Sequence, residues 1–412
     1  MMGKIDLSKL KDLMKGLGGL RVYLVLIWPA VILLACGVVL TAAWLMGSSL
    51  KQKADRESVP MGNQVREMLK KLPAAGQAEV EKRYQDAYRQ DANLIKLLSV
   101  ESDQRELLSY DIFPQPKDTS TLLFARFGAR FRQGVEGLIA KVHGGDCPGA
   151  EELNTARQTG RSPGFFGLGG AGGVSASSRI VEEICHARAK SVSVYADPGT
   201  VSGYDFWKAY QYSNMDDSVK DCWFWQVGYW IIEDVFSTAG TMNAGSSSVL
   251  TSPVKRVERV GFVTPDALLS VGTGKTSQDR PKYVTKPEEQ LTESFTGRVS
   301  NENIDVVHFS MVVVLSSKAI IPFMRELCSA KEHGFTGFTG QESAKVFKHN
   351  QITILESRVK PVDLTSVDHR YYRYGSDSVV EVELVCEYIF NKKGYDAVKP
   401  ELIKNPVAKT GV

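Results

Sequence analysis

The amino-acid sequence predicts an α+β protein that is held at a membrane by a single N-terminal transmembrane helix. Residues 22–46 form an apolar run without a charged side chain. The segment after it spaces its apolar residues as a helix does, and the last third of the chain has the alternating apolar pattern of strands. The 412 residues are enough for two or three domains beyond the membrane helix.

The apolar run is long enough to cross a membrane. A helix of 25 residues covers the hydrocarbon core of a bilayer, which is roughly 30 Å thick. A cleaved signal peptide is the alternative, but its apolar core usually has only roughly 7 to 15 residues. Residues 1–21 carry an excess of Lys and Arg. The positive-inside rule therefore predicts a cytoplasmic tail at residues 1–21, a span at residues 22–46 in the inner membrane, and a periplasmic location for the rest.

Residues 61–115 are predicted to form a helical stalk. Pro73 marks a break between two helical segments. In the second segment charged residues dominate, and the apolar residues form a narrow stripe at near-helical spacing: Val80, Tyr84, Tyr88, Ile95 and Leu98. Such a stripe is typical of a coiled coil or of a short helical pair.

Residues 120–265 are predicted to form a helix-rich α+β domain that contains a glycine-rich loop at residues 160–173. The aromatic segment at residues 222–240 is apolar enough to raise the question of a second membrane span. Polar residues interrupt it, which favours a helix buried in the domain or packed on a partner: Gln226, Glu233 and Asp234.

Residues 300–395 are predicted to form a ferredoxin-like domain. A strand, a helix and two further strands follow one another, and this β-α-β-β order is part of a ferredoxin-like layout. Residues 178–263 have a looser helix-strand-helix-strand order that would suit a second such unit. Residues 396–412 are predicted to be a C-terminal tail.

The last strand carries an acidic row, Glu381, Glu383 and Glu387, on the face opposite its apolar residues. We expect this row to be solvated, or to face a basic surface on a partner. Just before the strand, Tyr371 and Tyr372 stand among basic residues, where they would form an exposed edge or bind an anion or glycan. These five residues are the candidate partner-facing side chains.

The motifs predict neither an enzyme nor a cofactor. The Gly-Lys-Thr run at residues 274–276 lacks the first glycine of a phosphate-binding loop, because Leu269 stands in its place. The histidines and cysteines have no metal-ligand spacing, and a net charge of +3 gives no reason to expect nucleic acid. No nucleotide, nucleic acid or metal is therefore expected.

Four segments carry a resemblance to a known family: "VKRVERVGF" at residues 254–262, then "VVHFSMVVVLSSKAIIPFMRELCSA", "NQITILESRVKPVD" and "YGSDSVVEVELVCEYIF". With the anchor and stalk, they resemble the PilO family of type IV pilus inner-membrane assembly proteins and its relatives in type II secretion.

The resemblance implies a membrane-embedded scaffold that acts by protein–protein pairing. Its implied partners are inner-membrane assembly proteins of similar fold, in a homodimer or heterodimer, with a secretin-linked lipoprotein and an actin-like cytoplasmic protein. The alternative is a membrane-tethered extracytoplasmic module that binds a ligand or acts as a sensor.

Overall fold

The computed structural model describes residues 24–71, 75–159, 173–270 and 279–404. The chain divides into two compact units, residues 1–90 and 91–412, which are described separately. The glycine-rich loop between residues 160 and 172, the Gly-Lys-Thr run and Pro73 lie outside the described residues.

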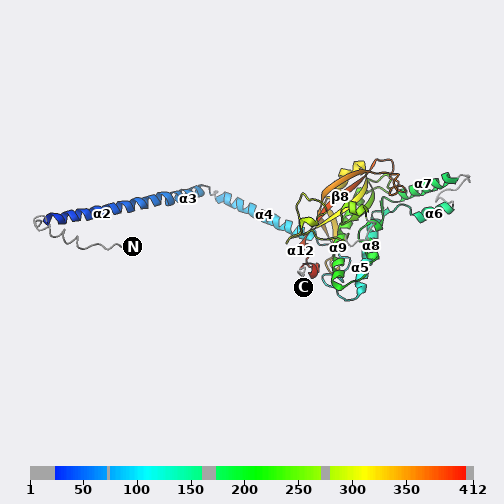
Figure 1. Ribbon diagram of the computed structural model, residues 1–412, viewed down its shortest axis with the longest axis horizontal. Coiled ribbons are helices and arrows are strands. Elements are labelled where there is room, and N and C mark those ends of the chain that lie inside the picture. Colours follow the sequence, from blue (N-terminus) through cyan, green and yellow to red (C-terminus); the bar gives the residue numbers. More distant parts are fainter. Residues whose placement is uncertain (1–23, 72–74, 160–172, 271–278, 405–412) are drawn as a thin grey trace, which may run out of the picture. The chain divides into compact units, whose positions relative to one another are not determined.

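The first unit is helical. Helix α2 (Leu24–Lys53) continues through a short π-helical turn (Ala54–Ser58) into α3 (Val59–Lys71), and α4 (Ala75–Glu101) begins in this unit (Figure 1). The helical stretch Val31–Lys70 contains a window of 18 residues with a mean hydropathy of 2.2, which is apolar enough to cross a membrane, and none of that window is buried. This confirms the prediction of one apolar N-terminal helix, although the helix does not end at residue 46.

The predicted stalk is helical only in part. Helix α4 ends at Glu101, and residues 102–120 run as turns and irregular backbone instead of a helix. The reason lies in the side chains of this segment, because Leu107, Ile112 and Phe113 are buried in the core of the second unit.

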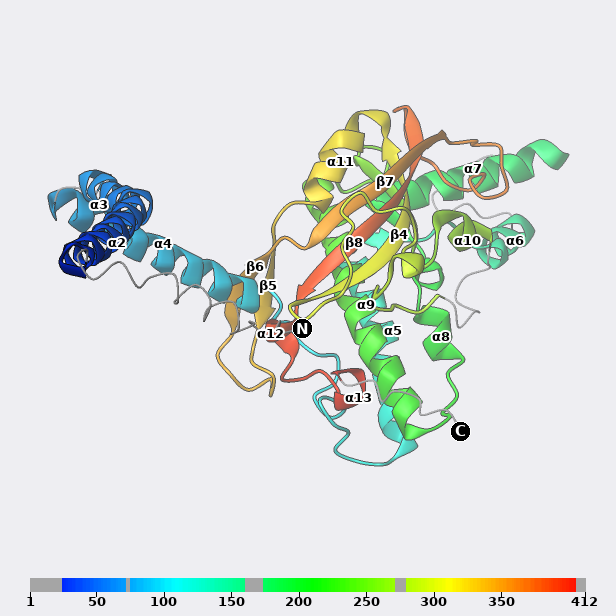
Figure 2. The ribbon, with the colours of Figure 1, turned by 60° about the vertical axis from the view of Figure 1, so that its left-hand side comes forward.

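A six-stranded sheet organises the second unit (Figure 2). Its order is β1 (Gly144–Gly145), β2 (Val194–Ala196), β3 (Val254–Gly261), β4 (Ile304–Ser316), β8 (Val379–Asn391) and β7 (Ile352–Pro361). Strands β1, β2 and β3 are parallel, and every later neighbour pair is antiparallel. Strands β5 (Lys331–Phe335) and β6 (Lys345–His349) form a separate two-stranded sheet.

Three helices build the main core on one face of the sheet: α5 (Thr121–Lys141), α9 (Met215–Met242) and α11 (Ile320–Leu327). Helix α9 packs against α5 and α11 and contacts β3 (Figure 2). The shorter helices are α6 (Ala150–Thr159), α7 (Gly173–Ser191), α8 (Tyr204–Lys208), α10 (Pro265–Ser270), α12 (Lys392–Tyr395) and α13 (Glu401–Lys404).

Helix α9 is the aromatic segment noted in the sequence. Asn214 caps it, because its side chain accepts a hydrogen bond from the Asp217 backbone N–H at 2.9 Å. Trp223, Trp225 and Trp230 are each at most 1% exposed. The sequence prediction of a helix inside the domain is therefore confirmed.

The structure is mixed helix and sheet, as predicted, but the division of the chain differs. Strand β3 of the predicted domain 120–265 pairs with β4 of the predicted domain 300–395, so the two ranges share one sheet. In the second range the strand-helix-strand-strand order is β4, α11, β7 and β8, with the β5–β6 hairpin inserted before β7. The start of the predicted tail also packs on the unit, where Val398 and Lys399 are buried.

Candidate functional site

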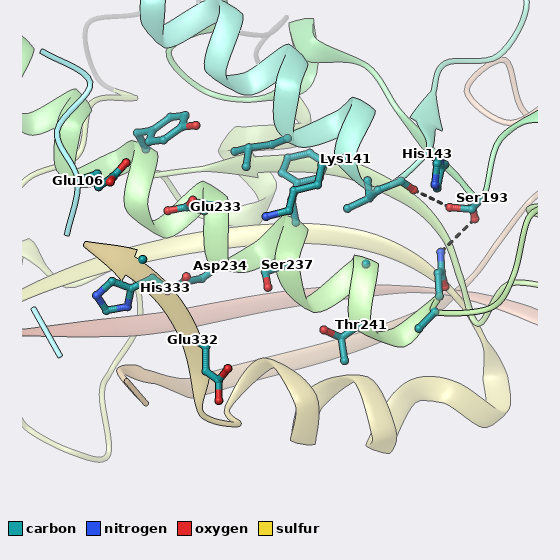
Figure 3. Close-up of a pocket in the computed structure, with 18 of the residues that line it drawn as sticks. Glu106, Lys141, His143, Ser193, Glu233, Asp234, Ser237, Thr241, Glu332 and His333 are labelled. Carbon is teal, nitrogen blue, oxygen red and sulfur yellow. Dashed lines mark hydrogen bonds between the residues drawn. The ribbon is translucent and has the colours of Figure 1, made fainter. Parts of the chain in front are cut away.

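A cavity of about 820 Å³ opens between α5, α9 and the β5 strand, and we call it the α5–α9 pocket (Figure 3). Its wall is rich in ionisable side chains: Glu106, Lys141, Glu233, Asp234, Glu332 and His333. Helix α9 forms one wall of the pocket, to which it contributes Asp234, Ser237 and Thr241 (Figure 3).

Asp234 is the centre of a buried polar network beside this pocket. Its carboxylate accepts hydrogen bonds from Arg105 Nη2 at 3.0 Å and Nη1 at 3.2 Å, from His349 Nε2 at 2.8 Å, and from the Tyr388 hydroxyl at 2.6 Å. Arg105 and Asp234 are each 2% exposed. Arg105 also donates to Glu233 Oε2 at 2.8 Å on the pocket side. The network thus joins the segment after α4, helix α9, hairpin strand β6 and central strand β8.

The β5–β6 hairpin is attached to this network through two histidines. The Nδ1 atoms of His333 and His349 are 3.0 Å apart, so one of them is the donor. His333 Nε2 lies 2.9 Å from the Gln104 carbonyl oxygen, to which it donates. The two imidazole rings therefore hold the hairpin against the segment after α4 and against helix α9.

Burial controls the electrostatics of these groups. Burial lowers the pKa of His333 to about 4, with the nearby Arg105 charge acting in the same direction. Burial alone would raise the pKa of Asp234, but the Arg105 guanidinium and the His349 hydrogen bond outweigh it and hold that pKa below its usual range. Asp103, next to the network, has its pKa raised by burial to about 7.

The predicted solvated acidic row is wrong for two of its three members. Glu383 is 2% exposed and pairs with Lys360 and Arg358 of β7. Glu387 is fully buried and accepts hydrogen bonds from Arg298 and from the Thr296 hydroxyl, the latter at 2.9 Å. These carboxylates lie on the sheet face opposite the helices, as the alternation indicated, but other segments of the same chain cover that face.

Glu381, the third member, is partly buried and lies next to His369 and to Glu258 of β3. These three residues form a group of metal-ligand type within the described part of the chain. Sequence reasoning missed it, because the three positions share no short spacing and come together only through the pairing of β3, β4 and β8.

The two predicted tyrosines have different surroundings. The Tyr372 ring stacks on Tyr374, Arg256 lies 4.0 Å from its centroid, and its hydroxyl donates to Asp146 at 2.8 Å. Tyr371 contacts Arg370, whose guanidinium carbon is 4.5 Å from the ring centroid. Tyr372 therefore has a packing role within the domain, and the structure does not bring either tyrosine into the α5–α9 pocket.

No protein-family model, curated protein or solved structure matches this chain.

Proposed function

We propose that the protein is a membrane-anchored scaffold of an envelope assembly machine, such as the inner-membrane platform of a type IV pilus or a type II secretion system. In this proposal α2 anchors the chain in the inner membrane with residues 1–21 in the cytoplasm. The α/β unit then acts in the periplasm by pairing with an assembly protein of similar fold, as a homodimer or a heterodimer.

The observation that carries the proposal is the edge strand β7. Within the described residues β7 pairs only with β8 among the strands, so beyond Ile354, whose backbone N–H bonds the Cys328 side chain, its other edge has no strand partner. Its middle residues 356–359 are exposed, and Val359 is 50% exposed. An open, exposed edge of this length is a template on which the strand of another chain can add by backbone hydrogen bonds.

The topology around β7 supports a ferredoxin-like interpretation. Elements α9, β3, β4, α11, β7 and β8 follow in chain order, and four of them form an antiparallel sheet in the order β3-β4-β8-β7. Moving the α9–β3 pair to the end of this list gives the β-α-β-β-α-β order of a ferredoxin-like unit. A partner of similar fold would bring its own edge strand to the same contact.

The acidic row is a poor candidate for the partner surface. Glu383 and Glu387 already have intramolecular partners and little exposed surface. Opening them to a partner would leave buried charges without their counter-ions, which costs several kcal/mol. Edge pairing through β7 requires no such rearrangement.

Site-specific photocrosslinking tests the proposal. A photoreactive amino acid is placed at Val359 in the full chain, cells are illuminated, and a tag after Val412 recovers the products. Leu122 on α5 is a matched control, because it is 54% exposed and lies away from the β7 edge. We expect adducts with another inner-membrane assembly protein, or with a second copy, from position 359 but not from position 122. Equal labelling at both positions, or no protein adduct, would reject pairing through β7.

The α5–α9 pocket favours a second candidate, a ligand-binding or sensory module. Its volume of about 820 Å³ is in the range of small-molecule sites, and Lys141 stands on its wall. Saturable binding of soluble cell-wall fragments by the solubilised full chain, weakened in Lys141→Ala, would favour this function. If the full chain binds no cell-wall fragment and position 359 gives specific protein adducts, the results support the scaffold function.

A further inference from the structure

Three side chains of metal-ligand type meet on the sheet face opposite the helices. Glu258 comes from β3, Glu381 from β8, and His369 from the segment between β7 and β8. One ligand atom of each lies within 4.8 Å of the others. The position of both carboxylates follows from the sheet, since β4 lies between β3 and β8 and pairs with both.

Glu258 gives the second, independent observation. It is 5% exposed, and its Oε2 atom is buried without a hydrogen-bond partner. The nearest cation is Arg256, whose Nη1 lies 3.7 Å from Oε2, beyond hydrogen-bond distance. A buried carboxylate oxygen without a donor is costly, and a bound cation would satisfy it.

The local charge also favours a cation. Glu258 and Glu381 are two carboxylates that face the same group; Arg256 is 3.7 Å from Glu258, and His369 is 3.9 Å from Glu381. The neighbouring Glu383 is neutralised separately by Lys360 and Arg358. Val312 and Val314 of β4, which lie between the two outer strands, are fully buried and give the group an apolar floor. In such surroundings an unpaired charge is poorly screened.

His369 is oriented for ligation by its other ring nitrogen. Its Nδ1 lies 2.9 Å from the hydroxyl of Tyr374, which is itself 4% exposed, and its Nε2 lies 3.9 Å from Glu381 Oε2. A hydrogen bond at one ring nitrogen fixes the ring and leaves the other for a metal, which is the usual arrangement around protein-bound metals. The backbone of this segment is also fixed, because Arg256 Nη1 donates to the Asp368 carbonyl oxygen at 3.1 Å.

We propose that Glu258, His369 and Glu381 bind one divalent transition-metal ion, with Zn²⁺ as the best match. One imidazole and two carboxylates suit Zn²⁺, at metal–ligand distances of about 2.0–2.2 Å. The three ligand atoms already lie within 4.8 Å of one another, and Zn²⁺ takes four ligands in a tetrahedral shell. The ion ties the segment between β7 and β8 to the sheet, next to the edge strand. This inference does not depend on the proposed scaffold function.

Metal binding by the full chain in detergent tests the proposal directly. The protein is stripped with a chelator, dialysed against micromolar Zn²⁺, and analysed for bound metal. We expect one Zn²⁺ per chain, and at least a tenfold weaker affinity in Glu258→Gln and in His369→Gln. His186→Ala is the matched control, because His186 is exposed on α7, and its affinity should equal that of the wild type. Failure to retain Zn²⁺, or equal retention in Glu258→Gln, would overturn the proposal.

X-ray absorption spectroscopy of the Zn²⁺-loaded wild type keeps the test valid if a variant fails to fold. We expect a first shell of oxygen and nitrogen with a single imidazole. Sulfur in that shell would place the ion on cysteines, which the chain also carries, and would refute the site. Far-UV circular dichroism in chelator shows whether each variant is folded, and Glu381→Gln replaces any that is not.

Discussion

Replacing Arg105 by Met tests whether the Arg105–Asp234 pair holds the second unit together. The substitution keeps much of the apolar stem but removes the guanidinium that binds Asp234 through two nitrogens, at 3.0 and 3.2 Å. Asp234 is 2% exposed, so its carboxylate would stay buried without its main counter-ion. His349 and Tyr388 would still donate to it.

Loss of one partner from a buried ion pair typically costs about 3–5 kcal/mol. Because two donors to Asp234 remain, we expect the lower end, about 3 kcal/mol, which is roughly a hundredfold change in the unfolding equilibrium. Combining Arg105→Met with Asp234→Asn removes the uncompensated charge, so the double variant should be more stable than Arg105→Met by at least about 1.5 kcal/mol.

Urea unfolding of the solubilised full chain, followed by tryptophan fluorescence, measures these differences. The matched control is Lys220→Met on α9, the helix that carries Asp234. It removes a surface ion pair, in which Lys220 Nζ lies 3.7 Å from Asp217, and should lower the free energy of unfolding by less than about 0.5 kcal/mol. A cost below about 1 kcal/mol for Arg105→Met, or a double variant less stable than Arg105→Met, would refute the reasoning.

The pH dependence gives this experiment a second readout. In the wild type the pKa of Asp234 is lowered, so its stabilising contribution is lost as the pH falls. Without Arg105, burial would raise that pKa, and protonation at low pH would relieve the destabilisation. The stability difference between wild type and Arg105→Met should therefore be larger at pH 8 than at pH 5. A constant difference would show that charge is not the cause.

Three further outcomes are expected from chemical unfolding. Glu387→Gln should destabilise the second unit by about 1–3 kcal/mol, because Arg298 loses its buried carboxylate partner. An unchanged free energy of unfolding would mean that the Arg298–Glu387 pair is not formed. Gly375→Ala should lower the free energy of unfolding by more than about 2 kcal/mol, because φ at this residue is +86° and an added Cβ would collide with the Leu250 carbonyl. Gly137 lies on the exposed surface of α5 with open space around it, so Gly137→Ala should instead stabilise the unit by about 0.5–1 kcal/mol. The pKa of His333 is about 4 in the folded protein, below the roughly 6.5 of a His in the unfolded chain. The wild type therefore loses stability as the pH falls from about 6.5 to about 4, because the unfolded chain takes up the proton first. Over that pH window the free energy of unfolding of His333→Gln should fall by about 2 kcal/mol less than that of the wild type. Parallel pH curves for the two proteins would show that His333 does not titrate in this way.

Local patterns in the sequence predicted the elements whose signal is contained in one segment. The apolar helix, the buried aromatic helix α9 and the long strands β4 and β8 all have such patterns. The alternation in β8 also placed the acidic row on the correct face of the strand. It failed to predict burial, because what covers Glu387 is Arg298, which lies 89 positions earlier in the chain.

Features that depend on distant pairing had no signal that one sequence could reveal. The Arg105–Asp234 hydrogen bonds span 129 positions, and the strands β1 and β2 are only two and three residues long. Joining the two predicted domains into one sheet depends on the β3–β4 pairing across a long connection. A charged residue inside an apolar helix, such as Asp234, was the one local hint that a buried partner exists.

The central position of β4 has a consequence for the order in which this protein can be made. Strand β4 is buried along nearly its whole length and joins β3 to β8, yet it begins only at Ile304. While the ribosome is still producing the first three hundred residues, the apolar faces of α9 and β3 have no strand to close over them. The nascent chain must be kept from aggregating until β4 and β8 emerge, so a prematurely terminated product would be a target for chaperones and proteases rather than a smaller working protein.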